Sequence, residues 1–459
     1  MAANNFIQGY RFTVTSTSAT VGATYTNNGQ TFTVLATIAA STTLICSGTG
    51  APSASGTLTK TSGTGSTPIT FSAVVTNTRA DSTQNWSLGV IPTLTDTNTA
   101  TFDASSPNCD ATFTNLICNI LDCTNYTGTL THSGRILQVG GNITLGAAMT
   151  LTNTTTNNYL SAYTTGGAAQ SIKSNGCYVP HLYISGINTH TVTLLDNFNV
   201  GIFQHLLSTN VVQTLNGFKI LVNDNYNLAT GARTIVGTTV IEFTGGAACS
   251  WGGTVNTSLV SNPIIINKSG GTLTLGAFIT QSASIITHTS GNVDASSCSF
   301  FSYGNTFNSI GFTFPLIYIR GTHTLNGSLS ATTMHIQTVS SFIGTDGFIV
   351  TNLYHYTLAT LANATLTLKS TVTYIISSLL KCESNSIQHI SISSVTPSSK
   401  AILNYNGTNA NQVLVNVDFT DINASGGNKL WTLNGVITNS DNIGVSTSSI
   451  VPVTVTKTF

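Results

Sequence analysis

The chain has 459 residues, a formal net charge of zero and only 6 % charged residues, against roughly 25 % in ordinary soluble domains. Its 14 lysines and arginines are scattered, which excludes the clustered positive charge that nucleic acids and anionic membrane surfaces require. Hydrophobic residues make up 41 % of the chain, enough to bury a substantial core and to exclude a disordered chain.

The N-terminal residues 1–17 carry neither the basic stretch nor the apolar stretch of a secretion signal. No apolar run approaches the ~18 residues that a membrane helix needs. The sequence therefore predicts synthesis in a cytoplasm, with no signal peptide and no membrane insertion.

Residues 1–78 predict a small β-domain of their own. The segment contains five or six short runs rich in Thr, Val, Ile and Tyr, which is the composition typical of strands. Asn28-Gly29 predicts a hairpin turn, because both residues tolerate a positive φ. Residues 61–67 indicate a further turn or a short linker. We expect a sandwich-like N-terminal module.

Residues 79–459 show weak repeats in which short strands alternate with bends at Gly or Asn. Residues 134–152 echo residues 217–235, an offset of about four rungs if each rung has about 20 residues. Residues 103–109 likewise echo residues 294–298. Helix patterns are nearly absent. The sequence predicts an all-β chain whose second part is a parallel β-helix or β-solenoid, with a closing segment at about 410–459. Tandem Greek-key sandwiches are the alternative architecture.

A lysine and a serine beside two glycines, within residues 243–276, raise the question of a phosphate-binding loop. Such a loop needs its glycines before the lysine and a helix after it. Here Gly270 and Gly271 follow Lys268, and the next residues have the pattern of a strand. The sequence instead predicts a bend at the two glycines, with Lys268 as an isolated charge on a neutral surface.

An aromatic-rich segment at 298–320 is the strongest candidate for ligand binding. Its rings could form a sugar-stacking face or a protein interface, and the alternative is a bulky part of the solenoid core or a cap. The candidate residues are Phe300, Phe301, Tyr303, Phe307, Phe312, Phe314 and Tyr318.

Catalytic, metal-binding and cofactor-binding sites are not predicted. Asp418 and Asp421 are the closest acidic pair that a polysaccharide-cleaving enzyme could use, yet their setting has the pattern of a turn in which Asp bonds the backbone. The nine histidines show no ligand spacing, so surface or rung positions are favoured for them. The eight cysteines include no CxxC pair, and small core positions are expected for them.

Three segments resemble virion structural proteins of environmental tailed bacteriophages. Residues 10–75 resemble a small β-module that recurs in such proteins, which implies that the N-terminal module, residues 1–78, serves attachment or assembly. Residues 85–104 resemble a Trp–Pro–Asp opening that precedes β-helical appendages, in which Trp86 and Pro92 close the first rung. Residues 417–443 resemble the closing segment of β-helical phage proteins.

The resemblance implies a non-enzymatic structural protein of a virus particle, located in the virion as a tail fibre, spike or capsid-mounted appendage. A capsid decoration protein that binds the coat lattice is the alternative. A polysaccharide-degrading tailspike and a bacterial surface adhesin are less favoured. The implied partners are coat or tail subunits, further copies of the chain in a homotrimer and a host glycan, without nucleic acid.

Overall fold

The structure is a computed structural model in two units, Met1–Val222 and Asn223–Phe459, which are described separately below. Strands make up 64 % of the structure, and the one helical turn among the described residues is the 3-10 turn η3 (Asn409–Asn411). No helix in the described part is long and apolar enough to cross a membrane. The described residues are 3–448 without 7–8, 15–18, 39–42, 49–50, 65–67, 78–85, 87–90, 95–98, 112–114, 133, 154–157, 165–168, 187–188, 208–211, 229–233, 253–258, 357–363, 385–388, 434–436 and 439–441.

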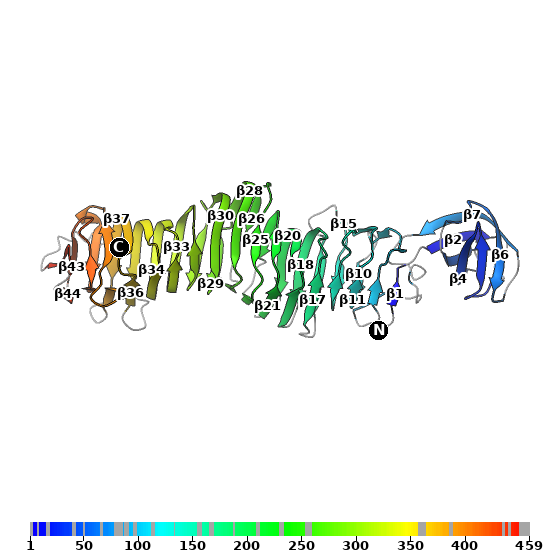
Figure 1. Ribbon diagram of the computed structural model, residues 1–459, viewed down its shortest axis with the longest axis horizontal. Helices are drawn as coiled ribbons and strands as arrows, with labels where there is room; N and C mark the ends of the chain where they lie inside the picture. The colour runs from blue at the N-terminus through cyan, green and yellow to red at the C-terminus, as the bar shows by residue number, and fades with distance from the viewer. Residues whose placement is uncertain are drawn as a thin grey trace, which may run out of the picture. The chain divides into compact units, whose positions relative to one another are not determined.

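The N-terminal β-domain is a closed antiparallel barrel rather than a two-layered sandwich (Figure 1). Its core is rich in aromatic side chains, and Phe12 stands edge-on to Phe71 with ring centroids 4.9 Å apart. The predicted hairpin is confirmed: Asn28 and Gly29 both have positive φ and join strands paired at Asn27 and Gln30. The barrel strands, in spatial order, are β2 (Gly9–Val14), β5 (Thr43–Gly48), β4 (Gln30–Ile38), β3 (Thr24–Asn27), β6 (Gly56–Ser62) and β7 (Ile69–Asn77).

The first strand of the chain does not belong to this barrel. Strand β1 (Ala3–Asn5) pairs in parallel with β8 (Thr99–Thr101), the first coil strand after the barrel. Phe6 forms a bridge with Trp86, and the fully buried Trp86 also contacts the ring of Phe102 at 5.6 Å. The barrel is thus an insertion between two segments that pair with each other, and the closing of the first rung by Trp86 and Pro92 stays a prediction. The division at residue 78 stays a prediction.

The remainder of unit 1 forms parallel coils. Side chains at matching positions of successive coils stack inside, as in the buried column of Leu137, Leu160 and Leu182. The coil strands are β8 (Thr99–Thr101), β9 (Cys109–Asp110), β10 (Leu116–Cys118), β11 (Ile120–Asp122), β12 (Thr129–Thr131), β13 (Leu137–Val139), β14 (Ile143–Thr144), β15 (Thr150–Thr152), β16 (Leu160–Thr164), β17 (Gln170–Lys173), β18 (Val179–Gly186), β19 (His190–Leu194), β20 (Phe198–Leu207), β21 (Val212–Gly217) and β22 (Ile220–Val222).

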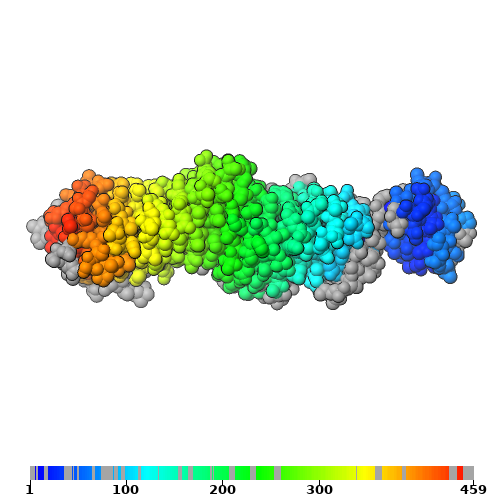
Figure 2. All heavy atoms as spheres, viewed as in Figure 1, coloured from blue at the N-terminus to red at the C-terminus, as the bar shows by residue number. Residues whose placement is uncertain are grey.

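Unit 2 also consists of parallel coils. In the space-filling view each coil packs directly against the next one (Figure 2). Ile241, Ile264 and Ile286 form one of its buried columns. Its strands are β23 (Asn225–Leu228), β24 (Thr234–Val236), β25 (Ile241–Phe243), β26 (Cys249–Trp251), β27 (Leu259–Val260), β28 (Ile264–Leu275), β29 (Phe278–Ser282), β30 (Ile285–Asp294), β31 (Ser299–Tyr303), β32 (Thr306–Asn308), β33 (Thr313–Leu325), β34 (Leu329–Gly344), β35 (Phe348–Tyr356), β36 (Ala364–Leu368), β37 (Thr373–Glu383), β38 (Ile390–Ser394), β39 (Ala401–Tyr405), β40 (Gln412–Val415), β41 (Val417–Thr420), β42 (Ile422–Asn423), β43 (Leu430–Leu433), β44 (Ile437–Thr438) and β45 (Val445–Ser448).

The predicted all-β fold, a small N-terminal β-domain followed by a parallel β-solenoid, is confirmed, and the solenoid has about 13 turns. The predicted rung length of about 20 residues agrees with hydrogen bonds between side chains 17 and 19 residues apart, from Thr313 to Ser330 and from Gln337 to Tyr356. The closing segment predicted at about 410–459 still consists of coil strands as far as Ser448, and its last residues lie outside the described part.

The two sequence echoes have different outcomes. Asp103 and Asp294 do occupy the same kind of turn, because each side chain accepts the N–H of the serine two residues later, at 2.8 and 3.0 Å. The longer echo is wrong as a structural repeat. It would place Leu137 and Ile220 at matching positions, but Leu137 belongs to a column that continues to Phe203, whereas Ile220 pairs with Phe198.

A buried polar column crosses unit 2 beside the apolar interior. Registers between neighbouring strands place Thr239, Asn262, Ser284, Asn305 and His323 at matching positions of successive coils, and all five are buried. The amide of Asn262 donates to the Thr239 carbonyl at 3.0 Å, and the Ser284 hydroxyl donates to the Asn262 carbonyl at 2.8 Å. Side chains from one coil therefore satisfy backbone groups of the next, which fixes the register.

All eight cysteines are free and buried, as expected for small core residues. Burial raises the pKa of Cys118 to about 12, so its reactive thiolate form is scarce at neutral pH. We expect that none of the eight thiols of the folded protein reacts within minutes with a thiol-specific dye, and that all eight react in denaturant. Rapid labelling of the native protein would contradict the buried positions.

Candidate binding face

The aromatic-rich segment divides between the core and the surface of unit 2. Phe300, Phe307 and Phe314 are buried, and Phe300 packs against Phe314 with ring centroids 4.9 Å apart. These three residues belong to the solenoid core. Their prediction as ligand contacts is wrong, because their rings are buried.

Phe312 lies apart from the other partly exposed rings of the segment. It is only partly buried, and it packs on His288 at 5.7 Å and on Phe314 at 4.9 Å. Its ring therefore continues the core outward at the end of a coil.

Phe301 and Tyr318 belong to a stack of four rings on the outer face of unit 2. The stack consists of Phe301, Tyr318, His335 and Tyr354, one from each of β31, β33, β34 and β35, at matching register positions. Successive ring centroids are 4.5, 5.0 and 4.7 Å apart, with interplanar angles of 2°, 24° and 5°. These spacings match the roughly 4.8 Å between hydrogen-bonded strands. We call these four residues the ring ladder.

The ring ladder presents edges rather than ring faces to solvent. Each inner ring is covered on both faces by its neighbours, and all four residues are partly buried. Burial lowers the pKa of His335 from its ordinary value near 6.5, so this ring is neutral at pH 7. The ladder is therefore a rigid, uncharged strip whose outward groups include the hydroxyls of Tyr318 and Tyr354.

Polar side chains flank the ladder on one side. Tyr303 lies opposite Arg320 in the register of β31 and β33, and the amide of Gln337 donates to the Tyr356 hydroxyl at 3.3 Å. The register between β33 and β34 shifts beside Arg320, where the single residue between Ile319 and Gly321 faces a longer insertion in β34. Such bulges redirect side chains and are common next to functional sites.

The strip ends at an ion pair on the following coil. Lys381 follows Tyr354 in the same register, and its ammonium lies 3.1 Å from the carboxylate of Glu383. Both side chains are exposed, so screening by water leaves this pair little weight for stability. Lys381 neutralises the negative charge of Glu383, so the pair adds no net charge to this part of the face.

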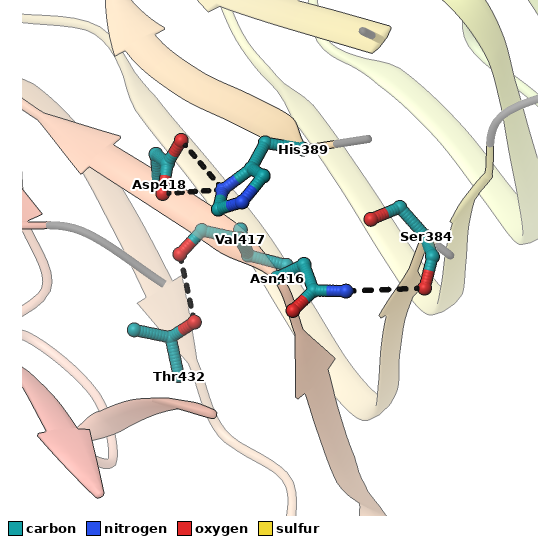
Figure 3. Close-up of polar contacts among 6 residues, drawn as sticks. All are labelled: Ser384, His389, Asn416, Val417, Asp418 and Thr432. Carbon is teal, nitrogen blue, oxygen red and sulfur yellow. Dashed lines mark hydrogen bonds and ion pairs between the residues drawn. The ribbon is translucent and has the colours of Figure 1, made fainter. Parts of the chain in front are cut away.

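The two acidic residues of the predicted pair, Asp418 and Asp421, bind different partners. Asp418 in β41 binds His389 through both carboxylate oxygens at 3.0 Å (Figure 3). Asp421 is 2 % exposed with φ +57°, and its carboxylate accepts the backbone N–H of Ser398 at 2.9 Å. The turn expected at this site is thus found at Asp421, whereas Asp418 lies in a strand.

Figure 3 also draws two hydrogen bonds made by neighbours of Asp418 in the chain, Asn416 and Val417. The Asn416 amide donates to the Ser384 carbonyl at 3.4 Å, and the Thr432 hydroxyl donates to the Val417 carbonyl at 2.7 Å. Both bonds join neighbouring coils through backbone carbonyls, so their evident role is to hold the coils together.

Lys268 is buried rather than on a neutral surface, and the prediction for it is wrong. It is 2 % exposed, and its ammonium donates to the carbonyls of Thr244, Gly245 and Ala247 at 3.2, 3.5 and 2.7 Å. The predicted bend is present as a register shift within β28. Gly271 there has φ +60°, and a Cβ atom would lie 2.5 Å from the Ala247 carbonyl, so only glycine fits.

We expect Lys268→Met to lower the free energy of unfolding by about 2 kcal/mol, because three backbone carbonyls lose their charged donor. Urea denaturation at pH 7 measures the loss. Lys173→Met, at an exposed position, is the matched control and should change stability by less than about 0.5 kcal/mol. Equal effects of the two substitutions would show that the buried ammonium is dispensable.

The histidines lie mostly inside rather than on the surface. His132, His181, His205, His323 and His355 are buried. Within the described ranges, no group of three or more His, Cys, Asp or Glu side chains is arranged to hold a metal ion.

No protein-family model, curated protein or solved structure matches the chain. The resemblance to phage virion proteins therefore has no independent support, and the function must be argued from the face itself.

Sequence reasoning missed His335, Tyr354, Tyr356 and Arg320 as neighbours of Phe301 and Tyr318. The signal that could have found them is the rung period: side chains one rung apart on the outer face lie 17 or 19 residues apart in this part of the chain. Stepping from Phe301 by such intervals reaches each ring of the ladder, although the period varies too much between coils to be fixed in advance.

Proposed function

We propose that the protein is a non-enzymatic structural component of a virus particle, a fibre, spike or capsid-mounted appendage that contacts a host-surface glycan. The observation that carries the binding role is the ring ladder with its polar flank, held on a parallel sheet. Every strand in such a sheet is hydrogen-bonded on both sides, which keeps the side chains in fixed positions without a ligand. The viral setting rests on the resemblance of residues 10–75, 85–104 and 417–443.

The partly buried state of the ring ladder favours adhesion over lattice packing. A surface that binds a coat lattice permanently would expose a large apolar patch. In the ladder the apolar ring faces already cover one another, and the groups that remain outside are ring edges and hydroxyls. Such groups suit a hydroxyl-rich ligand.

The proposed partners are coat or tail subunits for the N-terminal barrel, and two further copies of the chain in a homotrimer. Leu195 and Phe218 support self-association. They follow the paired residues Leu194 and Gly217 of neighbouring coils, and they are 47 % and 54 % exposed. Sedimentation of the purified chain at three times the monomer mass, reduced by Leu195→Ser with Phe218→Ser, would support the trimer. A monomer at micromolar concentration would contradict it.

Electron microscopy of purified virus particles with gold-labelled antibodies against the chain tests the proposed setting. Label on intact particles is the expected result, at the tail for a fibre or spike and over the shell for a decoration protein. Particles that carry no label would contradict the proposal.

The non-enzymatic part of the proposal has its own test. Incubation of the purified chain with a viscous capsular polysaccharide should leave the viscosity unchanged. A fall in viscosity that Asp418→Asn abolishes would overturn this part, because it would assign catalysis to the His389–Asp418 pair.

A further inference from the structure

The side chain of Arg320 is exposed at the edge of the candidate binding face. It extends outward from β33 beside Tyr303 and opposite the bulge in β34. In the part of the chain that the structure describes, its guanidinium belongs to neither the Lys381–Glu383 nor the His389–Asp418 ion pair and has no ion-pair partner. A planar guanidinium of this kind matches a carboxylate with two parallel hydrogen bonds.

The charges around Arg320 leave its attraction for an anion intact. Glu383 is the acidic residue of the face, and Lys381 neutralises it at 3.1 Å. The next side chains on the face are neutral: Tyr303, Gln337 and Tyr356. Arg320 is thus an uncompensated positive charge beside a strip of tyrosine hydroxyls, in a chain where only 6 % of residues are charged.

We propose that this face binds an acidic polysaccharide, with Arg320 paired to a sugar carboxylate and the outward hydroxyls and amides of Tyr303, Gln337 and Tyr356 bonded to sugar hydroxyls. The inference rests on the proposed function and specifies its ligand class. The ring ladder, which spans roughly 14 Å over three strand spacings, supplies the flat floor beside the sugar chain. An acidic peptide offers the same carboxylates but lacks the dense hydroxyls that this polar flank would bond.

Binding of the full chain to immobilised polygalacturonate, measured at low and at physiological salt, tests this proposal. We expect binding that falls at least about tenfold when the carboxylates of the polymer are reduced to alcohols, the size of a lost charged hydrogen-bond pair. Arg320→Gln should weaken binding to the acidic polymer to a similar extent and leave the weak binding to the reduced polymer unchanged. Arg11→Gln, at an exposed position of the N-terminal barrel, is the matched control and should bind as the unchanged chain does.

Three outcomes would overturn the proposal: no binding of polygalacturonate, equal binding of the reduced polymer, or full binding by Arg320→Gln. Poly-L-glutamate bound as tightly as polygalacturonate would overturn the carbohydrate class and assign the face to acidic peptides. Thermal melting of each variant separates loss of binding from loss of folding. If antibodies label the virus particles but the chain does not bind polygalacturonate, the proposed function is still supported and only the acidic polysaccharide is ruled out as its ligand.

Discussion

Lowering the pH from about 7 to about 4 will reduce the free energy of unfolding of unit 2 by about 6 kcal/mol, with about 3 kcal/mol from each of two buried histidines. Burial lowers the pKa of both His323 and His355 from 6.5 to about 4. His323 is 0 % and His355 1 % exposed, so water does not screen the cost of charging either ring.

The sign of the effect follows from which state binds protons. Between pH 6.5 and 4 the unfolded chain protonates these histidines, whereas the folded chain keeps them neutral. Their contribution is therefore complete above pH 6.5, declines as the pH falls and levels off below about 4. The carboxylates with lowered pKa, Asp103 and Asp294, lose their contribution only below their ordinary value of 3.8, outside this window.

The contacts of the two rings agree with neutral forms. The Nδ1 atom of His323 lies 3.0 Å from the Gly321 carbonyl, and its Nε2 atom lies 2.8 Å from the Ser302 hydroxyl. A proton on Nδ1 therefore leaves Nε2 free to accept from Ser302. In His355 the Nδ1 atom faces the Ile336 carbonyl at 3.2 Å, and Nε2 is buried without a hydrogen-bond partner. A second proton on His355 would have no acceptor.

Urea denaturation from pH 7 to pH 4 measures this dependence. The variant His355→Leu should lose about half of the slope between pH 6.5 and 4, because one of the two titrating rings is gone. We expect this variant to fold, because Leu suits the apolar column of Ile336, Cys382 and Leu414. The double variant His323→Gln with His355→Leu should lose most of the slope and keep a smaller part from His335 and His132, whose pKa burial also lowers. A double variant with the full slope would mean that other groups titrate there.

The sequence predicted those parts of the fold that depend on local chemistry. Asn28-Gly29 forms the expected hairpin because positive φ at both positions is a local property of these two residues. The strand composition of the chain likewise predicted stacked coils, because alternation of Thr with Val, Ile or Leu buries one side chain in two. The Asp103 turn repeats at Asp294 for the same reason: an Asp side chain can accept the N–H two residues on in any surrounding.

The parts that depend on register between coils could not be predicted. Phe300 and Phe301 are adjacent in sequence, yet Phe300 lies in the core and Phe301 begins the ring ladder. Side chains alternate between the two faces of β31, and the sequence does not show which of the two residues faces inward. Lys268 was expected on the surface because nothing near it in sequence shows the three carbonyls, at Thr244 to Ala247, that surround its ammonium. His389 meets Asp418 because the two residues lie on neighbouring coils, and their separation of 29 residues exceeds the average rung.

Asn305→Ala will destabilise the coils of unit 2 by about 3–5 kcal/mol, far more than the removal of an exposed asparagine. Asn305 is fully buried. Its amide donates to the Gln281 carbonyl at 2.9 Å and to the Ser302 hydroxyl at 2.8 Å, and its side-chain oxygen accepts the N–H of Ser284 at 3.0 Å. Each buried group left without a partner costs about 1–3 kcal/mol, and the missing side chain also leaves a cavity.

Asn326→Ala is the matched control, because Asn326 is exposed and its amide makes one bond to Asn308, at 3.0 Å. It should change the free energy of unfolding by less than about 0.5 kcal/mol. Hydrogen exchange should show faster exchange in β29 to β33 for Asn305→Ala, since coils depend mainly on their nearest neighbours. If both variants behaved alike, the coils would be held by their apolar columns alone. The expected difference instead assigns the register of unit 2 to its buried polar column, because apolar side chains can pack in more than one register while a paired amide cannot.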